Sequence, residues 1–481
     1  MTRLAAVLVV TALVAAAPAA AFIPNDPLAA KQWYLVQDHA FDTWADPPPP
    51  TLFQPVKVAI VDSGIDAGHP DFAGKILTGR SFVGGDWRTD QQGHGTFVAG
   101  EIAAALDGQG IVGLAYPAAQ LVIAKVVRRD GTIPLRAEAA AIRWAADAGA
   151  RVINLSLGGV RDPRSPERDT FSRLESDAVA YAYQKGAVLV AAVGNGDEAP
   201  VTPWPFASYP AALPHVIGVS AFGRNGSVPA FSNRDRIYDD IAAPGQEMFS
   251  TFPRDLTALR PTCPDQGYSD CGPDDYRHPE GTSFAAPQVS AAAALLLSLA
   301  PALRPDQVGA LLEHTADDAN ASNGCAACPL LRDGYTGWGR LDVAKAIGSL
   351  GGLLPAADRY ESNDDAGLYA HTVYGRAGRL EATVDYYDDQ IDVYRVHLEK
   401  RQRITANLAG PGGSNVELVL WKPGTQQVND LRSQRLRAAQ SVRPGAREQV
   451  AYRARVAGWY FLEAKITSPG YGPYTLTFSK S

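Results

Sequence analysis

Three residues that lie far apart in the chain, Asp62, His94 and Ser283, have the types needed for nucleophilic catalysis. Asp62 precedes Ser-Gly, His94 stands between two glycines, and Ser283 follows Gly-Thr. A serine hydroxyl is a weak nucleophile until an imidazole accepts its proton, and the imidazole needs a carboxylate that fixes its tautomer. We therefore interpret Ser283 as a nucleophile, His94 as its general base and Asp62 as the residue that orients the base.

Each of these segments also has a purely structural explanation. Asp62 could form a polar turn, His94 could be a hydrogen-bonded loop residue, and Ser283 could cap a helix. The catalytic interpretation is favoured because all three lie where strands end or helices begin, the region in which open α/β sheets place their sites. A fourth residue, Asn195, follows a predicted strand and offers its amide to an oxyanion, although Asn-Gly is also a common turn.

The elements that position these residues alternate between strand and helix. Residues 56–61 form a short apolar run rich in β-branched residues, which predicts a buried strand. Residues 136–148 have helical spacing and precede a predicted strand at 151–157, and a helix that ends at Gly186 precedes another strand at 187–193. This alternation predicts an α/β fold with a doubly wound, mostly parallel sheet.

The pattern changes beyond Gly348, where Gly, Pro and acidic residues at 350–365 predict a linker. Short alternating strands separated by turns follow, and they predict a small all-β sandwich. The predicted strands are 391–398, 403–408, 416–421, 450–456, 459–465 and 474–478. A chain of 481 residues is long for one core, so we expect two domains, at 55–349 and 366–481, with 22–54 as an N-terminal segment containing a Pro-rich stretch.

The N-terminus has the three-part layout of a secretory signal, with Arg3, an apolar stretch over 4–14, and Ala-Pro-Ala-Ala-Ala before Phe22. We expect residues 1–21 to be removed on export, so that the protein is extracellular, periplasmic or on the outer surface of a bacterium. The alternative is a membrane anchor, but Pro18 would interrupt the span and alanine is only weakly hydrophobic.

Charge and cysteine content restrict the partners. The net charge of -7 gives no reason to expect a nucleic-acid partner, and we expect a monomer without stable membrane association. Four cysteines in an exported chain indicate two disulfides with three possible pairings, of which we prefer Cys263 with Cys271 and Cys325 with Cys328. A redox or zinc site at the CxxC segment is the alternative, but one CxxC supplies only half a zinc site.

Three segments, VDSGID (61–66), GHGTFVAG (93–100) and GTSFAAP (281–287), together resemble the signatures of the subtilisin-like serine peptidases, in the family's order Asp, His, Ser. The resemblance runs from about Asn25 to about Ser349. It implies an endopeptidase that hydrolyses polypeptides through an acyl-enzyme on Ser283, with no cofactor required for the chemistry. It also implies that the oxyanion is held by Asn195 and the backbone N–H of Ser283.

The resemblance further implies a substrate site. Ser156, Leu157 and Gly158 match the family's substrate-binding strand, whose backbone pairs with an extended peptide. Ser208 falls near the floor of the primary specificity pocket, and a small floor admits large side chains. The Asp-Glu pair at 197–198 would favour basic side chains, although surface carboxylates are more often simply solvated.

Asp71 and Asp107 align with positions that hold a structural calcium ion in many relatives, and carboxylates with nearby carbonyls suit calcium. The alternative is two surface acids in loops. Phe97 and Phe284 depart from the residues common in relatives, and neither position is catalytic in them. We also expect the usual inhibitory pro-domain to be missing, so that folding proceeds without it.

The tail is similar to the pre-peptidase C-terminal β-sandwich of secreted bacterial peptidases, on the segments ESNDD (361–365) and YDDQIDVY (387–394). The resemblance implies a role in secretion or substrate contact. A secreted binding protein that keeps a peptidase fold as a scaffold is a second hypothesis, but such relatives lack a triad member. A lipase is excluded because Ser283 has no Gly-x-Ser-x-Gly elbow. We expect activity to fall as His94 is protonated, around its ordinary pKa of about 6.5 or below.

Overall fold

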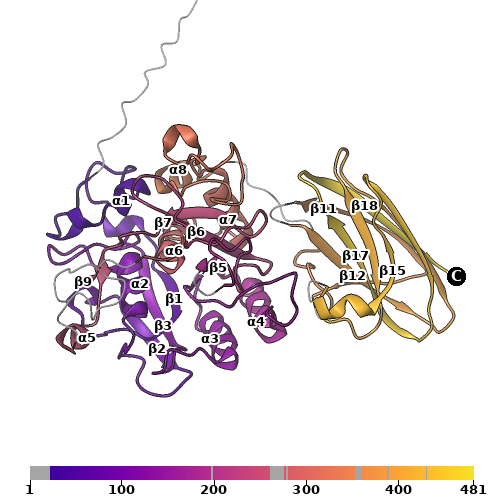
Figure 1. Cartoon of the computed structure of the whole chain (residues 1–481), viewed down its shortest axis with the longest axis horizontal. Helices are drawn as coiled ribbons and strands as arrows, with labels where there is room; N and C mark the ends of the chain where they lie inside the picture. Colours follow the sequence, from indigo (N-terminus) through magenta and orange to yellow (C-terminus); the bar gives the residue numbers. More distant parts are fainter. Residues whose placement is uncertain are drawn as a thin grey trace, which may run out of the picture.

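The structure is a computed structural model that describes residues 22–196, 199–259, 276–277, 280–352, 359–367, 369–386, 389–428 and 431–481. The predicted signal at 1–21, the acidic pair at 197–198 and the cysteines at 263 and 271 lie outside the described residues. Two bodies follow each other along the chain (Figure 1). The first is an α/β body and the second consists of β-strands.

The α/β body is built on a seven-stranded sheet in the order β2-β3-β1-β4-β5-β6-β7, in which every neighbouring pair is parallel. The order reverses around β1, which confirms the predicted doubly wound α/β class. The strands are β1 (Val56–Asp62), β2 (Ile76–Ser81), β3 (Ala119–Lys125), β4 (Val152–Leu155), β5 (Val188–Ala192), β6 (Val216–Phe222) and β7 (Ile241–Pro244).

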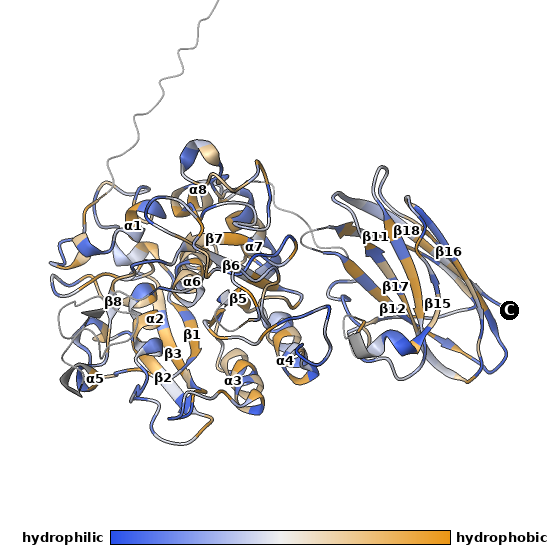
Figure 2. Ribbon diagram, viewed as in Figure 1, coloured by the Kyte–Doolittle hydropathy of each residue, from blue (hydrophilic) through white to orange (hydrophobic). Residues whose placement is uncertain are grey.

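Helices cover both faces of this sheet because its strands are apolar on both sides. In β1, Val58 and Ile60 belong to one hydrophobic core, whereas Ala59 and Val61 belong to the other. The first core packs against α2 (His94–Ala103), α6 (Thr282–Leu299), α7 (Pro305–His314) and α8 (Val343–Gly348). The second packs against α3 (Leu135–Asp147) and α4 (Arg173–Gln184). Figure 2 shows the apolar residues concentrated on the central strands and helices.

Among the described residues one helix, α6, is long and apolar enough to cross a membrane, and 89% of that window is buried inside the protein. It is the central helix of the first core. Shorter elements are α1 (Tyr34–Gln37), α5 (Arg254–Leu259), β8 (Ser250–Thr251) and β9 (Tyr276–Arg277). The strand predicted at 151–157 is shorter than expected: β4 spans only Val152–Leu155.

The second body pairs a five-stranded sheet, β10-β12-β17-β14-β15, with a four-stranded sheet, β11-β18-β13-β16. One hydrophobic core draws residues from both sheets, as expected for a sandwich. All its strand pairs are antiparallel except β10 with β12. The strands are β10 (His371–Val373), β11 (Ala377–Asp385), β12 (Ile391–Leu398), β13 (Arg403–Ala409), β14 (Val416–Trp421), β15 (Arg437–Ser441), β16 (Arg447–Arg453), β17 (Gly458–Ile466) and β18 (Tyr471–Lys480).

Two polar contacts join the α/β body to residues that lead into the β-sandwich, one at Asp364 and one at Tyr369. His215 Nε2 lies 2.6 Å from Asp364 Oδ2, and the His215 ring stacks on Tyr183 with ring centroids 3.7 Å apart. The Tyr369 hydroxyl donates to the Asp177 carbonyl oxygen at 3.1 Å.

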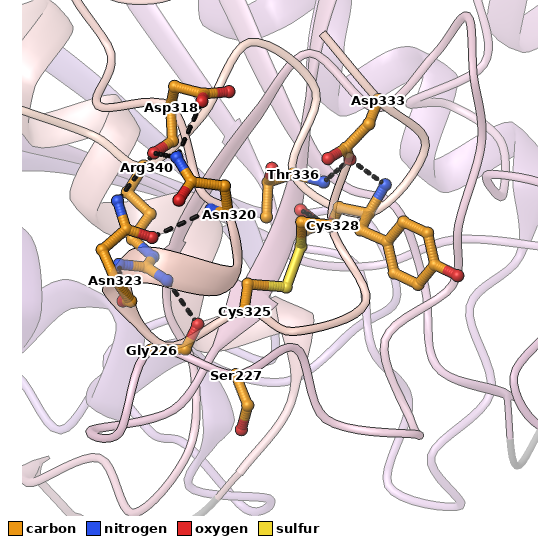
Figure 3. Close-up of a disulfide and its surroundings, with 12 residues drawn as sticks. Gly226, Ser227, Asp318, Asn320, Asn323, Cys325, Cys328, Asp333, Thr336 and Arg340 are labelled. Carbon is orange, nitrogen blue, oxygen red and sulfur yellow. Dashed lines mark hydrogen bonds between the residues drawn. A yellow bond between two sulfur atoms is a disulfide. The ribbon is translucent and has the colours of Figure 1, made fainter. Parts of the chain in front are cut away.

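A disulfide joins Cys325 and Cys328, as preferred from the sequence (Figure 3). Both cysteines are buried in a small cluster with Ala319. The surrounding loops are held by Arg340, whose guanidinium donates to the carbonyl oxygens of Asn323 and Gly226. The disulfide therefore lies in a structural region and not beside the residues proposed for catalysis.

Candidate active site

Asp62 and His94 meet at the carboxyl end of β1. Asp62 is the last residue of β1, and His94 is the first residue of α2. His94 Nδ1 lies 2.9 Å from both carboxylate oxygens of Asp62, so Nδ1 carries the proton and Nε2 is left as the acceptor. The Asp62 side chain is 3% exposed and the His94 side chain 30% exposed. The imidazole is therefore accessible to a substrate, whereas the carboxylate is not.

The glycines on either side of His94 allow this approach. A Cβ atom on Gly95 would lie 2.3 Å from the carbonyl oxygen of Gly64, on the segment that follows Asp62. Gly93 has φ of 88°, and a Cβ atom there would lie 2.2 Å from the Phe252 ring. A larger residue at Gly95 would push α2 away from the end of β1 and separate the imidazole from its carboxylate, and one at Gly93 would collide with Phe252.

Ser283 lies in the first turn of α6, next to His94. The ring of Phe284, the following residue, packs against the His94 imidazole with centroids 5.2 Å apart. Within the described chain, the Ser283 hydroxyl donates to the Ser156 carbonyl oxygen at 3.2 Å rather than to His94. A hydrogen bond between nucleophile and base is often formed only when substrate binds.

Asn195 follows β5 and contacts the same turn of α6. Its Oδ1 accepts hydrogen bonds from the backbone N–H and the hydroxyl of Thr282, both at 3.1 Å. Because that N–H can only donate, the oxygen must face Thr282, and Nδ2 is left as a free donor among the described residues. A Cβ atom on Gly281 would lie 3.5 Å from this Nδ2. The amide donor and the positive end of α6 are thus placed at one point.

The residues predicted to bind substrate follow β4 and border the same site. The Ser156 hydroxyl donates to the Ser283 carbonyl oxygen at 2.6 Å, which ties this segment to α6. Leu157 and Gly158 follow Ser156, and a Cβ atom on Gly158 would lie 2.6 Å from the Tyr209 carbonyl oxygen. Ser208 is 5% exposed and accepts a hydrogen bond from Asn233 Nδ2 at 3.3 Å. The segment at 156–158 and Ser208 therefore pack together.

Electrostatics at His94 changes one sequence-based expectation. Burial by itself lowers the pKa of the imidazole, but the charge and hydrogen bond of Asp62, with the charge of Asp90, raise it above 6.5 overall. The expectation that His94 titrates at about 6.5 or below is therefore wrong in direction, because the charge and hydrogen bond of Asp62, with a smaller contribution from Asp90, outweigh the effect of burial on the pKa.

The two acids predicted as calcium ligands both contact the loop at 105–111. Asp71 Oδ2 accepts from the Ile111 N–H at 3.0 Å, and Asp107 Oδ1 accepts from the Gln109 N–H at 3.0 Å. A third acid that sequence reasoning missed, Asp26, accepts from the N–H groups of Asp107 and Gly108 through Oδ1. Its Oδ2 is buried without a hydrogen-bond partner, and burial raises its pKa. The Asp26 Oδ2 is an oxygen of the kind that calcium binds, but these three acids are not among the groups in the described chain whose ligand atoms all lie within 4.8 Å of one another, so an ion here would also need backbone carbonyl oxygens.

Two further buried residues that sequence reasoning missed, Asp90 and Lys125, lie beside the Asp62 segment. The local signal for Asp90 is an aspartate placed four residues before the first residue of a helix, where it can bond the free N–H groups. Lys125 ends a buried apolar strand, which carries no signal that its side chain faces the site.

Comparisons with known proteins agree with this geometry. The family model described as Subtilase family, Peptidase_S8, matches residues 54–335. Thermitase of Thermoactinomyces vulgaris is 33% identical over 331 residues, which cover 68% of this chain and 99% of that protein. Subtilisin DY of Bacillus licheniformis is 36% identical over 272 residues, which cover 56% of this chain and 85% of that protein.

A solved structure of a protease from Pseudoalteromonas arctica superposes with a TM-score of 0.53 at 27% identity, and covers 68% of this chain and 99% of that one. The range matched by the family model contains Asp62, His94, Asn195 and Ser283. The β-sandwich lies outside that range.

Proposed function

Because the chain belongs to the subtilase family and is a subtilisin-like serine endopeptidase, we propose that Ser283 is its nucleophile, His94 its general base and Asp62 the carboxylate that orients the base. The observation that carries this proposal is the pair of 2.9 Å distances from His94 Nδ1 to Asp62, beside the helix turn that holds Ser283. The substrates are polypeptides.

In the proposed reaction the Ser283 hydroxyl turns from the Ser156 carbonyl oxygen to His94 Nε2 and attacks the scissile carbonyl carbon. His94 takes the proton and later gives it to the leaving amine, and water then hydrolyses the acyl-enzyme by the same route. The oxyanion accepts from Asn195 Nδ2 and the Ser283 N–H. The Ser156 carbonyl oxygen, once released, is available to an N–H of an extended substrate.

The test of this function is a peptide-library digest with the wild type and Ser283→Ala in parallel. The wild type should cleave internal peptide bonds, and the variant should cleave none above background.

We further propose that Ser208 forms the floor of the pocket for the side chain before the cleaved bond. Ser208→Tyr should then disfavour large side chains at that position in the same library, while an unchanged preference would contradict this assignment.

Replacing Asn195 by alanine is expected to lower kcat by roughly 100- to 1,000-fold with little change in KM, as for the corresponding amide of subtilisin. The reason is that the lost donor faces charge that develops only in the transition state. Steady-state kinetics on a peptide ester or anilide measures the effect. Asn225→Ala is a matched control, because Asn225 also precedes a glycine but is exposed, and its Oδ1 accepts from Ser227 of its own turn. A loss confined to KM would contradict the assigned role.

The pH dependence of kcat/KM should show an acid limb with its midpoint above 6.5. General-base catalysis needs neutral His94, and the Asp62 and Asp90 carboxylates favour the protonated imidazole. Activity is therefore lost as pH falls through the raised pKa. A midpoint below 6, or a flat profile from pH 5 to 9, would count against His94 as the base.

We also propose a structural calcium site formed by Asp26, Asp71 and Asp107 around the loop at 105–111. When bound, the ion would neutralise the charge of these carboxylates and hold the loop to which they bond. At a calcium concentration 100 times Kd the stabilisation is about 2.7 kcal/mol, or roughly 5 °C in Tm. EDTA should lower the Tm by about this amount in the wild type. Asp26→Ala should abolish the response, and Asp46→Ala, at an exposed acid, should not.

For the remainder of the chain we propose export with removal of residues 1–21, a monomeric state, and a C-terminal domain of the pre-peptidase type at 366–481. N-terminal sequencing of the secreted protein and light scattering test the first two. Secretion and digestion of a protein substrate by a chain that ends at Ser349 test a role for the tail.

A further inference from the structure

Asp90 connects the segments on both sides of the Asp62–His94 pair. It is 5% exposed, and Oδ1 accepts hydrogen bonds from the Ser63 hydroxyl and the Gly93 N–H, both at 2.8 Å, and from the Gln92 N–H at 3.0 Å. Oδ2 accepts from the N–H of Thr96 at 2.9 Å and from its hydroxyl at 2.8 Å. One carboxylate therefore holds the residue after Asp62 and the residues that flank His94.

Lys125 holds the same segment from the neighbouring strand. It is paired directly with Asp62 in the register of β3 and β1, so the two side chains lie on the same face of the sheet. It is 6% exposed, and its Nζ donates to the carbonyl oxygens of Ser63 at 2.6 Å and Thr89 at 2.9 Å. The ammonium thus bonds the backbone immediately before Asp90 and immediately after Asp62.

Ser63 connects Asp62, Asp90 and the residue after His94 by hydrogen bonds. Its N–H donates to Asp62 Oδ1 at 2.6 Å, its hydroxyl donates to Asp90, and the same hydroxyl accepts from the Gly95 N–H at 2.9 Å. Gly95 follows His94 directly. A displacement of Ser63 would therefore move the carboxylate and the imidazole relative to each other.

We propose that Asp90 and Lys125 are positioning residues of the peptidase site, which hold Asp62 and His94 in register through Ser63; Asp90 acts on His94 by its charge, and Lys125 acts on it through the charges of Asp90 and Asp62. This inference rests on the proposed roles of Asp62 and His94. Neither residue touches substrate in the proposed reaction. Burying one charge of each sign beside the site is costly unless both are hydrogen-bonded, as they are here.

The charged groups of the network that holds His94 come from three elements. Asp62 ends β1, Asp90 lies in the loop before α2, and Lys125 ends β3; α6 contributes the uncharged ring of Phe284. Burial has the largest effect on the His94 pKa and lowers it, Asp62 raises it, and Asp90 raises it further. Lys125 interacts with the charges of Asp90 and Asp62. Asp86 also acts on Lys125, but its side chain is 52% exposed and is paired with Arg88, so solvent screens it.

The deciding measurement is the NMR titration of the His94 imidazole in full-length protein that carries Ser283→Ala, which requires no turnover. Asp90→Asn should lower the His94 pKa, and Lys125→Met should raise it, each by about half a pH unit, since contact pairs shift a pKa by 1 to 3 units and these charges act from further away. Lys125→Arg keeps the charge and should leave the His94 pKa close to its value in the Ser283→Ala protein.

In the otherwise wild-type enzyme, Asp90→Asn and Lys125→Met should each lower kcat by roughly 10- to 100-fold with KM nearly unchanged, because a misplacement of about 1 Å costs about 100-fold. The midpoint of the acid limb of kcat/KM should move to lower pH in Asp90→Asn and to higher pH in Lys125→Met, as in the NMR titration. Ser63→Ala removes the hydroxyl that bonds Asp90 and Gly95 without changing any charge, so it should lower kcat in the same way.

Two controls match the substitutions. Lys57→Met removes a lysine that also donates to a backbone carbonyl, at the opposite end of β1, and Asp342→Asn changes a carboxylate that caps α8. Both should leave the His94 titration unchanged. The proposal is overturned if the two charge variants leave the pKa unmoved or move it the same way. If Asp90→Asn does not fold, Lys125→Met alone decides by the sign of its shift. If the wild-type enzyme hydrolyses no peptide, the proposed function is refuted, whereas the NMR titration still tests the positions of the charges around His94.

Discussion

Ser283→Ala is expected to lower kcat for peptide hydrolysis by roughly one million-fold, the size of the loss for the nucleophile of subtilisin. The hydroxyl oxygen is the atom that forms the acyl-enzyme, and alanine has none. The remaining rate comes from oxyanion binding and substrate positioning, and should still exceed the uncatalysed rate by roughly 1,000-fold. Because the binding surfaces are untouched, the inhibition constant of a noncovalent peptide should change little.

The measurement combines steady-state hydrolysis with labelling by a fluorophosphonate, which reacts only with an activated serine. The wild type should take up one label and the variant none. Ser298→Ala is the matched control, because Ser298 is a buried serine near the other end of α6, where its hydroxyl donates to the Gln54 carbonyl oxygen at 2.6 Å. Retained labelling of Ser283→Ala would identify a different nucleophile and refute the mechanism.

Asp62→Asn is expected to lower kcat by about 10,000-fold at neutral pH. The Ser63 N–H donates to Oδ1, so the oxygen of an asparagine would stay there and its NH₂ group would replace Oδ2 beside His94 Nδ1. His94 Nδ1 lies within reach of both positions, but an N–H of the new NH₂ group directed at it favours Nδ1 as an acceptor, which moves the ring proton to Nε2. In that tautomer the imidazole cannot take the proton from Ser283.

This substitution changes no volume, so the Tm should change far less than the rate. Nitrogen NMR of the imidazole should show the proton on Nδ1 in the wild type and on Nε2 in Asp62→Asn. Asp46→Asn, which makes the same chemical change at an exposed position, should leave both rate and tautomer as in the wild type. A variant that keeps the wild-type tautomer but loses activity would show that Asp62 acts in another way.

The fold class was predictable because it follows from periodicity within short segments. The apolar run at 56–61 became β1, and the helical spacing at 136–148 became α3 within one residue at each end. In the sandwich, β12 and β14 have the predicted bounds. Three strands, β10, β11 and β15, were missed. The inward residues of β11 include Leu380, Ala382 and Val384 between exposed neighbours, an alternation that could have been found.

The sequence alone also determined which residues are candidates for catalysis, since Asp62, His94, Asn195 and Ser283 lie in short motifs whose neighbours are part of the signal. Only the tertiary structure decided what surrounds them. Asp90 bonds Ser63 across 27 positions of the chain, Lys125 bonds Ser63 across 62, and Asp26 bonds Asp107 across 81. The place of Asp90 before a helix is a local signal, but its bond to Ser63 and the contacts of Lys125 and Asp26 leave none, because they depend on which strands pair and which faces meet. The raised pKa of His94 arises in the same way, from charges that come together only when the sheet is formed.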